Sequence, residues 1–107
     1  MPINQIYLNG VLVETQDTRT IIEAQKENIE ITKINTSSAI KNAGLDLITQ
    51  QNAALGIYEP ARCEAIKNYI AACRNEYLRC KGLILAATSN DEADSVQFIA
   101  PPVPENL

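Results

Sequence analysis

Two short apolar runs surround a turn signal at the start of the chain. Ile6-Tyr7-Leu8 precedes Asn9-Gly10, and Val11-Leu12-Val13 follows it. The Asn-Gly dipeptide accepts positive φ at both central positions of a tight turn, which is what a two-residue hairpin loop requires. The pattern therefore predicts a β-hairpin over residues 3–15.

The next stretch has a mixed pattern. Thr20 and Glu23 have the spacing of a capping box, which predicts a short helix over 21–27. Between residues 28 and 34, isoleucines alternate with polar residues as they do in a strand, although the last isoleucine breaks the alternation. We favour a third strand at 28–34, and a helix there stays open as the alternative.

Helical spacing begins after residue 36. Apolar residues recur at steps of three and four behind Thr and Ser caps, and they predict a helix over 38–55. Gly56 is placed to end this helix, and Pro60 is placed in the first turn of the next one. The two helices are expected to pack as an antiparallel hairpin.

The second helix, predicted over 61–88, has the most regular pattern in the chain. Its apolar residues alternate steps of three and four, as in a heptad stripe. Such a helix would be about 42 Å long, which is more than the shorter first helix can cover. We infer that another protein chain covers the rest, unless Gly82 ends the helix early. The stripe consists of Cys63, Ile66, Ile70, Cys73, Tyr77, Cys80, Ile84 and Ala87.

Basic residues flank this stripe at one heptad position. Lys67, Arg74 and Lys81 are spaced by seven, and charges at such positions usually select a helical partner. Contact with nucleic acid is the more specific alternative for these basic residues. A net charge of −4 and the absence of interleaved aromatic residues argue against it.

Residues 95–107 are predicted to form an extended arm. They contain three prolines, which cannot donate backbone hydrogen bonds, and they hold too little apolar surface to fold alone. Phe98 and Val103 offer apolar points that the groove of a neighbouring subunit could hold. We therefore expect the arm to become ordered on assembly.

These elements predict a single α+β domain, mainly α, over residues 1–107. It comprises a β-rich part at 3–35 with the N-terminal hairpin, an antiparallel pair of long helices at 36–89, and the extended C-terminal arm at 95–107. A chain of 107 residues is long enough to bury one core and too short for two.

The composition argues against catalysis and metal binding. The chain has no histidine, which removes the commonest general base and most zinc and copper sites. Its three cysteines are spaced by ten and seven along one predicted helix, so they cannot converge on a metal ion. They are expected to be reduced core thiols. We predict no cofactor and no enzymatic activity.

Nothing in the sequence predicts secretion or membrane insertion. The N-terminus lacks the basic and apolar regions of a signal peptide, and no apolar run approaches the ~18 residues that a spanning helix requires. We expect the protein in the cytoplasm or within a virus-like particle.

One resemblance suggests an enzyme. Met1-Pro2-Ile3-Asn4-Gln5-Ile6, followed by Leu8, is similar to the start of the 4-oxalocrotonate tautomerase family. The resemblance implies a processed N-terminal Pro2 that acts as the catalytic base on a first strand. It ends after residue 8, where the family continues into a long helix and this chain has its hairpin signal.

The function that the sequence favours is a non-enzymatic structural or adaptor subunit of a homo-oligomer or larger protein assembly. A small virion, neck or tail component of a phage is one such role, by analogy alone. The alternatives are an N-terminal-proline tautomerase and a small regulatory nucleic-acid-binding protein.

Overall fold

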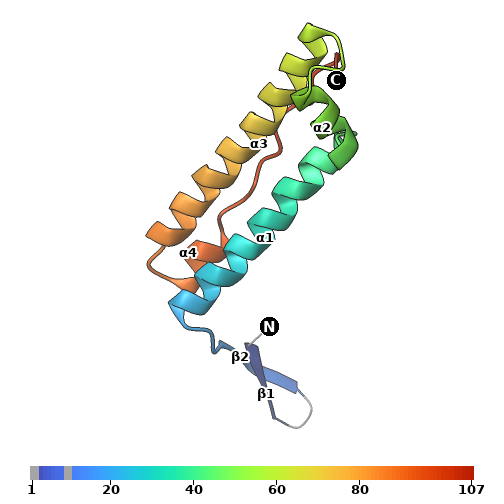
Figure 1. Ribbon diagram of the computed structural model, residues 1–107. Coiled ribbons are helices and arrows are strands. Elements are labelled where there is room, and N and C mark those ends of the chain that lie inside the picture. The colour runs from blue at the N-terminus through green and yellow to red at the C-terminus, as the bar shows by residue number, and fades with distance from the viewer. Residues whose placement is uncertain (1–2, 9–10) are drawn as a thin grey trace.

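The computed structural model describes the backbone of residues 3–8 and 11–107 and the side chains from residue 17 onward. Two long antiparallel helices, α1 (Ile21–Asn42) and α3 (Pro60–Ala86), form an elongated body (Figure 1). The short helix α2 (Leu47–Ala54) lies at one end and α4 (Asn90–Asp94) at the other. The whole molecule measures 66 × 29 × 19 Å.

The two strands lie outside this body. β1 (Ile3–Leu8) and β2 (Val11–Asp17) pair with each other in antiparallel fashion, beyond the α4 end. Within the described part of the chain, neither strand packs on a helix. The α+β fold class is therefore wrong: the packed domain is all-α, and the hairpin predicted at 3–15 forms no sheet layer in it. The predicted Asn9-Gly10 turn lies outside the described residues.

A single helix, α1, replaces the predicted short helix and third strand. Its capping box forms as expected, because the Glu23 N–H donates to the Thr20 hydroxyl and the Thr20 N–H to the Glu23 carboxylate, both at 3.1 Å. Of the three isoleucines, Ile29 packs against the core, whereas Ile31 and Ile34 are 46% and 62% exposed, so the three do not share the one face that a strand would bury. The Thr32 hydroxyl donates to the Asn28 carbonyl at 2.8 Å, which satisfies a buried β-branched residue within a helix.

The helix predicted over 38–55 is two helices with a break between them. α1 ends where Gly44 takes a φ of +83°, a conformation that favours glycine. The Gly44 N–H donates to the Lys41 carbonyl and the Leu45 N–H to the Ile40 carbonyl, as in a Schellman motif. Asp46 then caps α2 by accepting the Thr49 N–H at 2.7 Å.

The second long helix is the element that the sequence predicts best. α3 spans Pro60–Ala86, against the predicted 61–88, and Pro60 occupies its first turn. Gly82 does not end it, and a side chain at this position would meet nothing within 4 Å. Its antiparallel partner is α1 and not a helix at 38–55.

The C-terminal segment, residues 95–107, runs back along the bundle from α4 toward α2 (Figure 1). The Ile99 N–H donates to the Glu76 carboxylate, and the Gln97 carbonyl accepts from Arg79, both at 2.8 Å. Phe98 and Leu107 pack against the buried core. The segment is extended, as predicted, but its own chain holds it in this structure.

The buried residues form two clusters along the body. The larger lies toward α2 and consists of Ala39, Leu45, Ala53, Ile66, Tyr69 and Cys73. The smaller lies toward α4, where three alanines allow the helices to approach closely around one large side chain. It consists of Ala24, Ile84, Ala87 and Ala93.

Candidate interaction surfaces

The predicted apolar stripe of α3 lies mostly inside the chain. Six of its members are buried: Cys63, Ile66, Cys73, Cys80, Ile84 and Ala87. Ile70 and Tyr77 are half-buried at its edge. Because α1 is 22 residues long and the C-terminal segment adds further cover, the premise of a partner helix too short to cover the stripe is wrong.

The two predicted contact points of the arm differ in exposure. Phe98 packs against the core of its own chain, whereas Val103 is 52% exposed. Tyr69 fixes the segment between them, since its hydroxyl donates to the Pro101 carbonyl at 3.3 Å. Burial raises the pKa of Tyr69, so its hydroxyl stays protonated and can donate at neutral pH.

A surface that the sequence analysis missed lies at α2. This helix buries only Ala53 and turns its larger apolar residues outward. Polar side chains of α2 form hydrogen bonds with the adjoining segments of the same chain. Gln50 donates to the Leu45 carbonyl at 2.9 Å, and Asn52 donates to the Tyr58 hydroxyl at 3.2 Å. We call the outward group the α2 tip, and it comprises Leu47, Ile48, Leu55 and Ile57, with exposures of 68%, 68%, 76% and 62%.

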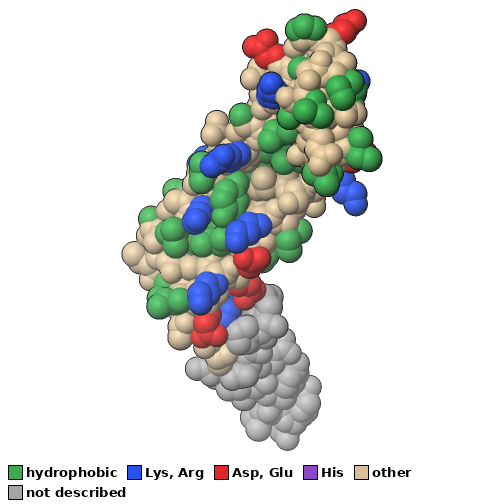
Figure 2. Space-filling model, in the orientation of Figure 1, with side chains coloured by type: hydrophobic (Ala, Val, Ile, Leu, Met, Phe, Trp, Pro, Cys, Tyr) green, Lys and Arg blue, Asp and Glu red, His purple; other side chains and the backbone are tan. Residues whose placement is uncertain are grey.

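The α2 tip is uncharged. No residue of α2 carries a charge, and hydrophobic side chains gather over this end of the molecule in Figure 2. Apolar groups clustered on a surface in this way mark sites of association, whereas single exposed apolar residues do not. The terminating glycine at Gly44 and the Asp46 cap were the sequence signals that could have revealed a separate helix here.

A second surface covers the flank of α3 opposite Glu76 and the C-terminal segment. Lys67, Arg74 and Lys81, the basic row, lie on it at seven-residue spacing, as predicted. Lys67 and Arg74 are exposed and Lys81 is half-buried. In the described part of the chain no acidic side chain pairs with any of the three.

Apolar residues border the basic row on both sides. Ile70 and Tyr77 follow it by three positions and are half-buried. Leu78 and Leu85 follow it by four and are 49% and 55% exposed. Figure 2 shows Lys and Arg side chains interleaved with hydrophobic ones along the middle of the body, while acidic side chains gather mainly toward its ends.

Two open depressions line the side of α3 that holds Ile70, Arg74 and Tyr77. One, of about 360 Å³, is bounded by Lys67, Ile70 and Arg74 with residues of α2. The other, of about 420 Å³, lies between Tyr77 and α1, where Lys33 contributes. Arg74 and Tyr77 are one helical turn apart, so the depressions are neighbours.

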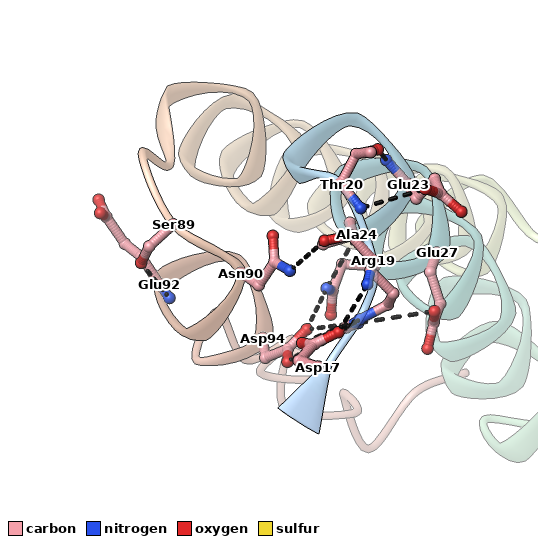
Figure 3. A network of polar contacts seen from close by, with 11 residues as sticks. Asp17, Arg19, Thr20, Glu23, Ala24, Glu27, Ser89, Asn90, Glu92 and Asp94 are labelled. Atoms are coloured by element: carbon pink, nitrogen blue, oxygen red, sulfur yellow. Dashed lines mark hydrogen bonds and ion pairs between the residues drawn. The ribbon is translucent and has the colours of Figure 1, made fainter. Parts of the chain in front are cut away.

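The α4 end contains a polar network centred on a buried arginine (Figure 3). Arg19, whose side chain is 3% exposed, forms ion pairs with Asp17 at 2.7 Å, Asp94 at 2.6 Å and Glu27 at 3.5 Å. These hydrogen bonds from Arg19 hold the pKa of Asp17 and of Asp94 below the usual range. We call this group, with Asn28 and Asn90, the Arg19 network.

The Arg19 network joins segments that are far apart in sequence. The Asn28 amide donates to Asp94 at 2.7 Å, and the Asn90 amide donates to the Arg19 carbonyl at 2.8 Å. It therefore fixes α4 and the start of the C-terminal segment to the beginning of α1. Every ionic group in it has a partner within the chain, although three carboxylates share the single Arg19 guanidinium.

The three cysteines are buried and free. Cys63 donates to the Tyr58 carbonyl at 3.4 Å, and Cys80 to the Gln97 carbonyl at 3.5 Å. Burial raises the pKa of Cys73 and of Cys80, which keeps both as unreactive thiols.

The described residues contain no group of three or more His, Cys, Asp or Glu side chains that could hold a metal ion. Among the same residues, no helix combines the length and the apolar character needed to cross a bilayer. Pro2, the catalytic residue that the tautomerase resemblance implies, lies outside the described residues.

Comparisons with family models, with curated proteins and with solved structures find no significant match to this chain. The two exposed surfaces, the α2 tip and the flank that carries the basic row, are therefore the features that bear on function.

Proposed function

We propose that this protein is a non-enzymatic structural or adaptor subunit that associates with a second copy of itself through the α2 tip. The observation that supports this proposal is the exposure of the large apolar residues of α2. The helix buries one alanine and leaves its Leu and Ile residues exposed.

Several properties of the tip favour a second copy as the occupant. Fully burying one Leu or Ile side chain stabilises a complex by roughly 1.5–3 kcal/mol, so four such residues per copy are a substantial driving force. The four tip residues are uncharged, so two identical tips would meet through apolar side chains, with the exposed carboxylates of Asp46 and Glu59 close to them in sequence. A twofold interface pairs the same patch on both copies, which suits a surface of this kind.

The position of the tip also suits assembly. It lies at the end of the body opposite the Arg19 network and the strands, so tip-to-tip contact would leave the remaining length of each copy free for other partners. A small component of a phage-like particle is one setting in which a short chain of this shape could serve. The non-enzymatic assignment rests on the lack of histidine and on the pairing of buried charges within the described chain.

Sedimentation equilibrium of the full chain tests the proposal. We expect a dimer at micromolar concentration and a monomer for Ile48→Glu. The substitution should weaken association at least about 100-fold, because an uncompensated charge buried in an apolar contact costs several kcal/mol.

The matched control is Ile34→Glu, which adds the same charge at an isoleucine of α1 with 62% exposure and should leave the dimer intact. A wild-type monomer at high micromolar concentration would contradict the proposal. So would an Ile48→Glu variant with the mass of the wild type.

A further inference from the structure

The flank of α3 that carries the basic row presents a repeated pattern. Lys67, Arg74 and Lys81 recur every seven residues, with Leu78 and Leu85 exposed on one side and Ile70 and Tyr77 half-buried on the other. The side chains thus form three parallel rows, a basic one between two apolar ones. They run from residue 67 to residue 85, a length of about 27 Å. A seven-residue repeat is the period at which two helices keep the same contacts along a left-handed supercoil.

The charges on this flank are uncompensated. Between residues 65 and 86 the only acidic residue of α3 is Glu76, and it points to the opposite flank, where it pairs with Arg79 at 2.7 Å. Lys33 of α1, which lines the depression beside Tyr77, pairs with Glu30 at 3.1 Å and so adds no net charge. The flank is thus locally basic in a chain whose net charge is −4.

From this pattern we infer that the flank binds a partner α-helix that presents acidic residues at heptad spacing beside apolar ones. Acidic side chains at that spacing would pair with the basic row, and the apolar residues would cover Leu78 and Leu85. The depression lined by Ile70, Arg74 and residues of α2 would receive a large apolar side chain. This inference adds the chemistry of a second partner to the proposed function and does not depend on the α2 tip.

A second copy of the chain and nucleic acid both fit this flank less well than an acidic helix does. A second copy would place three unpaired positive charges of one basic row against the same three of the other. Nucleic acid would satisfy the positive charges, but its phosphate backbone offers nothing apolar to cover Leu78 and Leu85, and only Tyr77 could stack on a base. A helix with both acidic and apolar positions satisfies all three rows.

The test uses a fluorescein-labelled synthetic peptide of three heptads with Leu at positions a and d and Glu at e and g. Matched probes carry Lys in place of every Glu, or are a labelled DNA duplex of similar length. In fluorescence anisotropy at low salt, we expect the full-length protein to bind the Glu peptide at least tenfold more tightly than either other probe. Raising the salt concentration should weaken that binding, because exposed charge pairs are screened.

Arg74→Glu and Lys41→Glu form the matched pair of variants. Both exchange an exposed helical cation that has no acidic partner among the described residues, but Lys41 lies on α1, outside the basic row. Arg74→Glu should weaken binding of the Glu peptide at least tenfold, and Lys41→Glu should change it less than twofold. Circular dichroism should show the same helix content for both variants.

Four outcomes would overturn the inference: no binding of the Glu peptide, equal binding of the Lys peptide, tighter binding of the DNA, or equal effects of the two substitutions. Loss of the dimer in Arg74→Glu would also overturn it, since the flank would then be the contact between copies. The Ile48→Glu monomer keeps an intact flank and should still bind the Glu peptide, so failure of the proposed tip contact is measured separately.

Discussion

The two ends of the helical body differ in which side chains they bury and which they expose. At the α4 end, Arg19 is buried and its three acidic partners belong to the same chain. At the α2 end, the Leu and Ile residues of the tip point into solvent, and polar groups hold the inner side of the helix. The charged groups of the first end are paired within the chain, whereas the second end leaves apolar surface exposed to solvent.

The difference between the two ends distinguishes residues that stabilise the fold from residues that are available for assembly. Burial by itself does not identify an interface, because the buried stripe of α3 is covered by its own chain. Exposed apolar residues suggest one only where they gather, as they do at the α2 tip.

The largest contrast is expected between two large-to-alanine substitutions. Ile84 is 1% exposed in the alanine-rich cluster at the α4 end, so Ile84→Ala should lower the free energy of unfolding by about 2–5 kcal/mol. Leu55→Ala, at a residue 76% exposed, should change it by less than about 0.5 kcal/mol. Urea unfolding in an Ile48→Glu background, where the tip contact is absent, measures both. Equal costs would mean that the tip packs within its own chain.

Acid should affect the α4 end more than the α2 end. The pKa values of Asp17 and Asp94 are lowered by Arg19, so their contribution to stability is complete above the ordinary Asp value of about 3.9 and is lost as the pH falls below it. Wild-type stability should therefore decline steeply below about pH 4, and Asp94→Asn should make the decline shallower. Association through the uncharged tip should be the same at pH 7 and pH 5.

Urea unfolding across this pH range measures the decline. The control is Asp91→Asn, which removes an exposed carboxylate from the same short helix outside the Arg19 network. If Asp91→Asn flattens the pH dependence as much as Asp94→Asn does, the effect is a general one of net charge and the network has no special role.

The sequence predicted the long helix α3 well because most of its buried residues follow the heptad pattern. The strand predicted at residues 28–34 was wrong because Ile31 and Ile34 are exposed, so their spacing does not follow a buried face. The single helix predicted at residues 38–55 was also wrong, because apolar periodicity continues across the break at Gly44. A terminating glycine and the Asp46 cap were both present there, and they outweigh periodicity when they occur together.

The surfaces were predicted unevenly. The spacing of Lys67, Arg74 and Lys81 was sufficient to place them on one flank of a helix. The orientation of α2 depends on which of its sides meets α3, a long-range contact that local patterns do not encode. The Arg19 network joins residues 75 positions apart, and no short sequence motif predicts such a pairing.

The smallest contrast concerns the helix caps at the two ends. Thr20 caps α1 through two reciprocal hydrogen bonds, whereas Asp46 caps α2 through one at 2.7 Å. Thr20→Ala should lower the free energy of unfolding by about 1 kcal/mol, a decrease of about 4–8 °C in melting temperature. Glu23→Ala removes only the bond that returns to the Thr20 N–H, so its cost should be smaller.

The double substitution Thr20→Ala/Glu23→Ala decides whether the capping box acts as a unit. Because each bond holds the geometry that the other needs, the double variant should cost less than the sum of the two single ones. Amide exchange should place the loss in the first turn of α1, beside Arg19, with no change in α2. Strict additivity in the melting curves, or increased exchange along α2, would show that the two ends are not the independent units described here.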